Sequence, residues 1–398
     1  MSREQAIDGP APANSTIVRR RDPSQDPAMR KFRVMYVLKN YPQMSETYIK
    51  TEIEAVCESC DVKIIATKPP NLPSKNHEPY SYTDDLSRVR EAIEEFRPDV
   101  LHGHWLHSVK MLGKLARKTG VPFTVRAHSF DSIWSEEDSA FRHFPLLSAF
   151  SRPSHIRRAV KFINDDLCLG VLTFPFSRAR LERAGIPSGK LVDCFPVVNF
   201  RRFYDVRPNG DAIMNVGACI PKKRMEDFVD LALGAPALEF NLYALGYKVD
   251  RLVEYARSRN SPVRFVPPIE LEDMPAQYKK HRWLVYTAAL GGRVGWPMAI
   301  AEAQASGVGV CMANIRPDIR QYAGEPAFFY NSLDDALKTI SQPFPEELRQ
   351  LGFEQAKKSD VRQHRSLLFQ LWRVDQVTMK TGEPVQVGGA APFAGSLG

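Results

Sequence analysis

The feature that most limits what this chain can fold into is a series of short, continuously apolar segments, each followed by a stretch with helical periodicity. Strands that are apolar on both faces are typical of parallel sheets covered by helices on both sides. We therefore predict two doubly wound α/β domains facing across a cleft. The first series of strands is RVMYVL, VKIIAT, DVLHGHW, PFTVRAH, LGVLTF and KLVDCFPVV, and the second is AIMNVGA, FNLYALG, VRFVPPI, RWLVYTA, GVGVCMA and PAFFYN.

The first expected helix illustrates the helical pattern. Ser45 is a good N-cap residue. Ile49, Ile53 and Val56 then recur at i, i+4 and i+7, which places them on one face of a helix.

Shifts in composition predict the borders of the domains. Residues 1–30 and 381–398 lack apolar periodicity, and we expect them to be disordered tails. Pro, Gly and charged residues interrupt the apolar rhythm at 199–211, which separates a domain at 31–200 from a domain at 201–345. A helical segment at 346–380 is expected to dock back across both domains.

Charge and cysteine content narrow the partners and the compartment. A net charge of +8 suits nucleic acid, an anionic membrane or a phosphorylated small molecule, but no nucleic-acid-binding motif is present, so we expect no nucleic-acid partner. The six cysteines have no zinc-ligand spacing, and we interpret them as reduced, structural thiols. Since no apolar signal core or membrane-spanning segment is recognisable, we expect a cytoplasmic protein.

A glutamate in the otherwise apolar segment VGWPMAIAEAQASGVGV is the first candidate binding residue. Pro297 and Gly307 predict the start and the end of a helix, whose N-terminal amides would favour an anion. Glu302 lies among alanines small enough to let a ribose approach, and its carboxylate can accept hydrogen bonds from two vicinal hydroxyls. The alternative is a partly exposed glutamate favoured by the helix dipole.

A second candidate is the loop in NVGACIPKKRMEDFVDLA, residues 215–232. Gly217 permits close approach at the end of a strand, and Lys222, Lys223 and Arg224 follow it. Three cations on a strand-to-helix loop can neutralise a diphosphate, although a solvated charged loop is the alternative. Because no glycine stands two residues after Gly217, the loop argues against a dinucleotide-binding dehydrogenase.

Histidines follow two strands of the first domain. His104 belongs to HGHWLHS, and His128 belongs to RAHSFD, with Asp131 three residues later. The carboxyl ends of parallel strands meet at one edge, so we expect these side chains to reach the same cleft. The alternative is that each histidine is a buried structural residue.

The segment SVKMLGKLARKTG, residues 108–120, predicts a basic amphipathic helix with Leu112, Leu115 and Ala116 on one face. A helix of this kind can lie on an anionic membrane. Peripheral contact with the inner face of the membrane is therefore open beside the alternative, an ordinary surface helix of an α/β domain.

Five segments together resemble the GT-B glycosyltransferases of the large retaining family 4, which have two Rossmann-like domains with the active site between them. They occur in the family's order between residues 33 and 330. The segments are YPQMSETYIKTEI, DVLHGHW, RAHSFD, NVGACIPKK and VGWPMAIAEAQASGVGV.

The resemblance implies roles for individual residues. Glu302 matches the glutamate that binds the donor ribose, Lys223 the lysine on the donor diphosphate, and His128 the histidine that contacts the transferred sugar. The implied donor-binding residues, in the domain at 201–345, are Gly217, Lys223, Arg224, Val294, Gly295, Trp296, Pro297 and Glu302. The implied acceptor-side residues, in the domain at 31–200, are Ser45, Glu46, Thr47, His104 and Asp131.

Two positions depart from the family pattern. Val294 stands where the family usually has a first glutamate that faces the sugar, and Ala218 stands where it usually has an arginine after the glycine of the diphosphate loop. Arg224 or Arg293 is available to replace this arginine. The departures leave the donor sugar open, and they keep a catalytically degenerate nucleotide-sugar binder as an alternative.

We therefore predict a retaining glycosyltransferase of the hexosyltransferase type that uses no metal ion and no cofactor. It would move a sugar from a nucleotide-diphosphate sugar to a sugar, lipid-linked or other glycan acceptor, as in polysaccharide, glycolipid or glycoconjugate biosynthesis. The sequence has no Asp-x-Asp motif, and a lysine-rich loop can stabilise a leaving diphosphate in place of a metal cation. A nucleotide-sugar epimerase or hydrolase on the same fold is the second enzymatic alternative.

Overall fold

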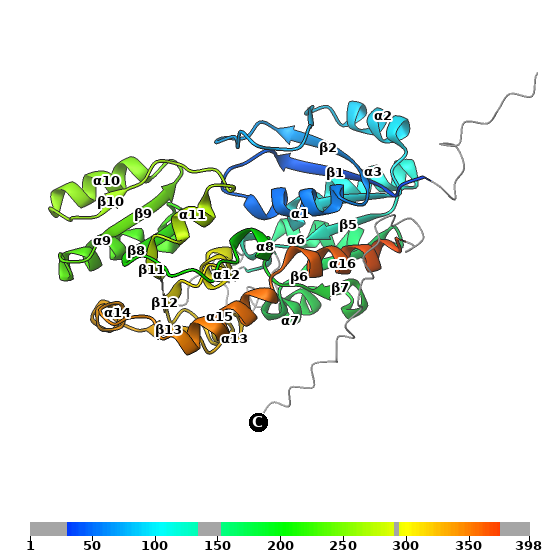
Figure 1. Ribbon diagram of the computed structural model, residues 1–398. Helices are drawn as coiled ribbons and strands as arrows, with labels where there is room; N and C mark the ends of the chain where they lie inside the picture. Colours follow the sequence, from blue (N-terminus) through cyan, green and yellow to red (C-terminus); the bar gives the residue numbers. More distant parts are fainter. Residues whose placement is uncertain (1–29, 134–152, 290–293, 375–398) are drawn as a thin grey trace, which may run out of the picture. The chain divides into compact units, whose positions relative to one another are not determined.

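Two parallel sheets form the core of the computed structural model, which describes residues 30–133, 153–289 and 294–374 (Figure 1). The strand order is β3-β2-β1-β4-β5-β6-β7 in the first sheet and β10-β9-β8-β11-β12-β13 in the second. All neighbouring strands are parallel. Each order reverses once, between β1 and β4 and between β8 and β11, so both sheets are doubly wound, and the predicted fold class is confirmed.

The first sheet and the helices that follow its strands are called the first lobe here. Its strands are β1 (Arg33–Asn40), β2 (Asp61–Lys68), β3 (Ser81–Tyr82), β4 (Val100–His104), β5 (Phe123–Arg126), β6 (Cys168–Thr173) and β7 (Leu191–Asp193). Its helices are α1 (Thr47–Cys57), α2 (Leu86–Phe96), η2 (Leu106–Ser108), α3 (Val109–Thr119), α4 (Ser129–Ser132), α6 (Ser154–Ile163), α7 (Pro175–Arg183) and η4 (Ser188–Lys190).

The second sheet and its helices are called the second lobe. Its strands are β8 (Ala212–Ala218), β9 (Phe240–Leu245), β10 (Arg264–Phe265), β11 (His281–Tyr286), β12 (Gly309–Ala313) and β13 (Ala327–Tyr330). Its helices are η5 (Pro221–Lys223), α9 (Met225–Gly234), α10 (Val249–Ser258), α11 (Met274–Tyr278), α12 (Met298–Ala305), α13 (Pro317–Ala323) and α14 (Leu333–Ile340). Three more helices are α8 (Phe200–Phe203), between the sheets in sequence, and α15 (Glu346–Lys357) and α16 (Val361–Trp372), after them.

Most differences between the predicted and the observed elements concern their ends. Strand β3 was not predicted, because its two residues are exposed and carry no apolar signal. Helix α1 begins at Thr47 with Glu46 at the N-cap position, so the assignment of Ser45 as N-cap is wrong by one residue. The apolar face of α1 is as predicted, since Ile49 and Ile53 are buried. The tails at 1–30 and 381–398 lie outside the described residues, except for Arg30.

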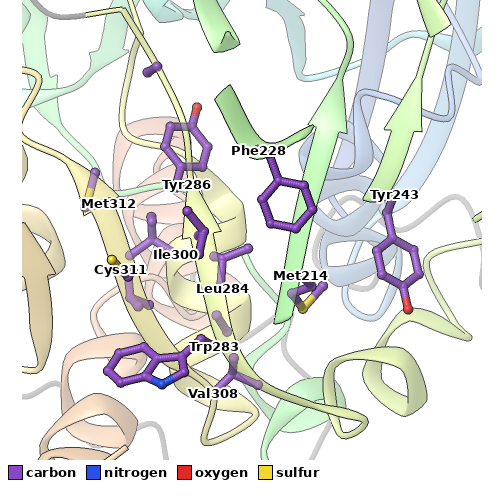
Figure 2. Packing of buried hydrophobic residues seen from close by; sticks show 14 of the residues in the cluster. Met214, Phe228, Tyr243, Trp283, Leu284, Tyr286, Ile300, Val308, Cys311 and Met312 are labelled. Atoms are coloured by element: carbon purple, nitrogen blue, oxygen red, sulfur yellow. The ribbon is translucent and has the colours of Figure 1, made fainter. Parts of the chain in front are cut away.

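The core of the second lobe holds α12 against its sheet. Figure 2 shows Trp283, Leu284 and Tyr286 of β11 beside Ile300 of α12 and Cys311 of β12. All five side chains are buried. Burying a side chain such as Leu284 or Ile300 contributes about 1.5–3 kcal/mol, so the position of α12 is fixed by packing.

The last helix packs on the first lobe. Helix α16 contacts α1 and β6 (Figure 1). Trp372 near its end donates a hydrogen bond from Nε1 to Thr124 Oγ1 in β5, at 2.9 Å. Trp372 and Thr124 are 248 positions apart, so this helix contacts a strand that is distant in the sequence.

Helix α3 covers the first sheet rather than presenting an apolar surface. Val109, Leu112 and Ala116 are fully buried against β4, β5 and α6, whereas Lys110 and Lys114 are exposed. An amphipathic helix binds a membrane through its apolar face, and here that face is inside the lobe. The structure thus corrects the membrane interpretation in favour of an ordinary surface helix. Nowhere in the described ranges is a helix long and apolar enough to cross a bilayer.

Candidate active site

A cavity of about 340 Å³ lies at the carboxyl ends of the strands of both sheets. In the second lobe it is bounded by residues at the ends of β8 and β11, and in the first lobe by residues that follow β1, β4 and β5. Each strand order reverses beside these ends, which is where doubly wound sheets bind ligands. Residues that line the cavity include Ser45, Thr47, Trp105, His128, Gly217, Lys223, Tyr286 and Glu302.

Glu302 is a buried carboxylate that faces this cavity. It lies on α12 and is 8 % exposed. Its Oε2 accepts a hydrogen bond from the hydroxyl of Tyr278, at 2.7 Å, which fixes the direction of the carboxylate. Burial raises the pKa of Glu302 to about 7, against the hydrogen bond from Tyr278 and the positive charge of Lys223. A ligand hydroxyl that donates a hydrogen bond to Glu302 would therefore stabilise the charged form of its carboxylate.

Lys223 reaches the cavity by lying across Gly217. A Cβ atom on Gly217 would come within 2.1 Å of Lys223 Nζ, and Gly217 has a φ of +140°. Only glycine therefore leaves room for this ammonium group at the end of β8. Burial and the neighbouring Lys222 lower the pKa of Lys223 to about 8, so at pH 7 the side chain is still mainly protonated.

His128 stands on the first-lobe side of the cavity. Its ring centroid lies 4.3 Å from that of Trp105 and 4.6 Å from that of Tyr48. Its backbone N–H donates to Asp131 Oδ1, at 2.7 Å, and its Nε2 lies 3.0 Å from His104 Nδ1. Burial lowers the pKa of His128 well below its usual range, and the neighbouring His104 and Arg126 lower it further, so the imidazole is neutral.

The acceptor-side residues predicted from the sequence do not all reach this cavity. Ser45 and Thr47 line it, as expected. His104 and Asp131 are 1 % exposed and lie behind the wall, where Asp131 accepts hydrogen bonds from the backbone N–H groups of Leu106, after β4, and His128, after β5. Glu46 lines a separate small pocket, and burial raises its pKa to about 7.

The predicted donor-binding residues at 294–297 line the cavity, whereas Arg224 does not. Val294 is 3 % exposed and forms part of both the core and the cavity wall. A Cβ on Gly295 would lie 2.5 Å from Ser129 Cβ, so this glycine lets the wall approach α4. Gly295 is followed on the wall by Trp296 and Pro297.

Arg224 instead forms a bidentate ion pair with Asp227, with both N–O distances at 2.7 Å. Arg224 is not among the residues that line the cavity. In this structure its guanidinium is held by Asp227, and its assignment as a donor-binding residue stays a prediction. Arg293, the other candidate, lies outside the described residues.

Sequence reasoning missed three buried groups at this site. Tyr278 orients Glu302 from α11, and Arg126 reaches the cavity wall from the end of β5. Glu52 of α1 lies behind the wall, and its ligand atoms together with those of His102 and His104 fall within 4.8 Å of one another, a spacing that a metal ion would need. The signal for this group was the alternation HGH in a fully buried strand, which points both rings to the same side.

The first lobe matches a known family model. Residues 35–192 match the model of the glycosyl transferase 4-like domain. A search of curated proteins found no match.

Solved structures share the whole two-lobed fold. HepE from Anabaena, in complex with UDP, has a TM-score of 0.64 and 13 % identity, covering 85 % of this chain and 99 % of its own. Sucrose-phosphate synthase from Thermosynechococcus elongatus has a TM-score of 0.63 and 14 % identity, covering 86 % and 98 %. The lipopolysaccharide outer core galactosyltransferase WaaB, in its apo form, has a TM-score of 0.56 and 12 % identity, covering 85 % and 99 %. The family match therefore confirms the resemblance for the first lobe, and the solved structures confirm the predicted fold.

Proposed function

We propose that this protein, a GT-B glycosyltransferase of the family 4 type, transfers a sugar from a nucleotide-diphosphate sugar to a hydroxyl of an acceptor with retention of configuration. The observation that carries the proposal is one cavity that joins three groups of complementary chemistry. Glu302 offers a carboxylate for ribose hydroxyls, Lys223 an ammonium for a diphosphate, and His128 a neutral imidazole for the sugar.

The donor that deserves the first test is a uridine diphosphate hexose. HepE was solved with UDP and also with UDP-glucose, and WaaB is named as a galactosyltransferase. These names describe the neighbours, and they support UDP-glucose and UDP-galactose as the first probes for this chain. Val294 supplies no polar contact to the sugar where the family usually has a glutamate, so hydroxyl recognition would rest on the other wall residues.

The mechanism follows from where charge develops. When the bond between the sugar C1 and the diphosphate oxygen breaks, the bond electrons pass to the diphosphate, and the fixed ammonium of Lys223 stabilises the added charge. An acceptor hydroxyl that attacks C1 from the same face passes its proton to that phosphate oxygen. Among the described residues that line the cavity, Glu302 is the one carboxylate, and its ribose role leaves none there for a covalent sugar intermediate.

A nucleotide-sugar binder without transferase activity is the second candidate. It is favoured by two observations at once: Ala218 lacks the family's arginine, and Arg224 is turned to Asp227 instead of the cavity. In such a binder Lys223 would neutralise the diphosphate of the bound nucleotide sugar.

Hydrolysis of UDP-glucose, followed by proton NMR, tests the proposal. The glucose of this donor is α-linked, so a retaining enzyme releases α-glucose first and the β anomer appears later by mutarotation. We expect this order, with or without EDTA. Early β-glucose would contradict retention, and binding of UDP without sugar release from UDP-glucose or UDP-galactose would favour the binder.

A further inference from the structure

A short segment of the second lobe, residues 269–272, contacts both the cavity and the first lobe. It follows β10 and leads to α11. Ile269 and Leu271 line the cavity. Glu270 and Glu272, which alternate with them in sequence, accept hydrogen bonds from the first lobe. The segment therefore bounds the cavity with two apolar side chains and is attached to the opposite lobe by two carboxylates.

Glu270 is bound by the loop that follows β2. Ser74 donates from Oγ to Glu270 Oε2, at 2.6 Å, and the backbone N–H of Lys75 donates to Oε1, at 3.0 Å. This loop is itself fixed to the cavity wall of the first lobe, because the carbonyl oxygen of Leu72 accepts a hydrogen bond from the backbone N–H of Met44, at 2.9 Å. The groups that bind Glu270 are therefore held in place within the first lobe.

Glu272 is bound by a buried lysine. Lys50 of α1 is 7 % exposed, and its ammonium donates to Glu272 Oε1. Asn76 donates from Nδ2 to Oε2 of the same carboxylate, at 3.0 Å. Although burial acts to raise it, these hydrogen bonds hold the pKa of Glu272 below its usual range. Within α1, Lys50 Nζ lies 3.8 Å from Glu54 Oε1, so Glu272 is the closer of the two carboxylates.

The burial of Lys50 gives the attachment its direction. An ammonium group that is removed from water without a partner is unfavourable, and a charge-assisted hydrogen bond offsets this cost. Lys50 therefore favours the arrangement in which the segment 269–272 lies against the first lobe. In that arrangement Ile269 and Leu271 form part of the cavity wall.

We propose that Lys50 and the loop at 71–76 position one wall of the donor site by holding the segment 269–272 in place. The inference rests on the proposed function, in which this cavity binds a nucleotide-diphosphate sugar. The two groups act through the wall and are positioning groups, not catalytic residues. Without the attachment, fewer molecules would have the wall in its binding position, and the apparent affinity falls with that fraction.

The alternative is that these contacts only stabilise the fold. In that case their loss would lower the free energy of unfolding and leave nucleotide affinity unchanged. Urea denaturation and nucleotide binding, measured on the same variants, separate the two roles.

Asp273 provides a matched control for Glu272. It is the next residue, it is exposed, and it occupies the N-cap of α11 without a side-chain hydrogen bond to that helix. Replacing either residue by alanine removes one carboxylate from the same stretch of the second lobe. Only Glu272→Ala also removes the partner of Lys50.

Calorimetry with UDP on the full chain tests the proposal. We expect Lys50→Met and Glu272→Ala each to raise the Kd roughly three- to tenfold, the scale of one partly exposed charge-assisted contact. Asp273→Ala should keep the wild-type Kd. The double variant Lys50→Met/Glu272→Ala should bind about as weakly as either single variant, because both changes remove the same contact. An unchanged Kd in the two single variants, or losses that simply add in the double variant, would overturn the proposal.

Hydrogen–deuterium exchange of peptides that cover 266–278 gives a readout that needs no nucleotide. These amides should exchange faster in Lys50→Met and Glu272→Ala than in the wild type and Asp273→Ala, whereas peptides of α14 in the same lobe should exchange alike in all four proteins. Equal exchange at 266–278 in all four would show that the first lobe does not hold the segment. If the wild type binds no UDP, that donor is wrong, and the exchange comparison still decides whether Lys50 holds the segment.

Discussion

Glu302 and Lys223 face one cavity with pKa values that burial moves toward each other, to about 7 and about 8. Both groups thus titrate close to neutral pH, because burial disfavours their charged forms and no ligand offsets this cost. A nucleotide diphosphate supplies that compensation, because its hydroxyls donate to the carboxylate and its phosphates neutralise the ammonium. His128 is kept neutral on the other side of the cavity, where an uncharged sugar would lie.

The pH dependence of donor binding tests the role of Glu302. Its folded-state pKa is raised, so the carboxylate is present above pH 7 and is lost as the pH falls through that value. Lys223 becomes more protonated over the same range, which offsets a small part of the effect. We expect UDP-glucose, whose phosphates do not titrate here, to bind roughly fivefold more weakly at pH 6 than at pH 7.5, since one pKa unit corresponds to about 1.4 kcal/mol. The dependence should vanish in Glu302→Gln, and the same slope in that variant would exclude Glu302 as its source.

The loop between β8 and α9 positions the ammonium group of Lys223, which lies where a side chain on Gly217 would be. Gly217 and Gly246 both follow or end a strand of the second sheet with a positive φ, +140° and +105°. A Cβ on Gly217 would meet Lys223 Nζ, whereas a Cβ on Gly246 would meet nothing within 4 Å. The two glycines therefore share backbone strain but differ in crowding.

Alanine substitutions at these glycines separate strain from function. Both variants should lose about 1–2 kcal/mol of unfolding free energy, because a side chain at positive φ is disfavoured. Only Gly217→Ala should also lose turnover and UDP affinity, because its methyl group displaces the ammonium of Lys223. Chemical denaturation and calorimetry measure both effects. Normal UDP binding in Gly217→Ala would show that Lys223 is not held as described.

Elements were easier to predict than the contacts between them. Apart from β3, each strand of the two sheets overlaps one of the apolar segments, because a buried parallel strand needs side chains that are apolar on both faces. The contact of Glu52 with His364 was not predictable in the same way, since these residues are 312 positions apart and no local pattern joins them. Tyr278 was missed for a similar reason, because a buried tyrosine looks like any other core residue until its hydroxyl partner is known.

The last described helix connects the end of the chain to the first lobe. Helix α16 comes after the second lobe in sequence but packs on α1 and β6 of the first lobe. Leu368 of α16 is 0 % exposed, whereas Leu351 of α15 is 42 % exposed. The first lobe therefore depends on residues from the end of the described chain.

Leucine-to-alanine changes on the two helices measure this dependence. Leu368→Ala should lower the unfolding free energy by about 2–5 kcal/mol, as expected for a buried leucine. Leu351→Ala should change it by less than about 0.5 kcal/mol, as is usual for surface positions. Urea denaturation of the two variants and the wild type gives the comparison. Similar stability of both variants would mean that α16 is not part of the core of the first lobe.

Calorimetric titration of UDP tests the central claim, that this cavity binds a donor diphosphate through Lys223 without a metal ion. The wild type should bind UDP with the same Kd in the presence and absence of EDTA. Lys223→Ala should weaken binding by at least about tenfold, since a hydrogen bond to a charged group contributes about 1.5–3 kcal/mol. Arg224→Ala, which removes a cation of the same loop that pairs with Asp227, should leave the Kd unchanged. If EDTA abolishes binding and magnesium or manganese restores it, or if Lys223→Ala binds UDP as the wild type does, the account is contradicted.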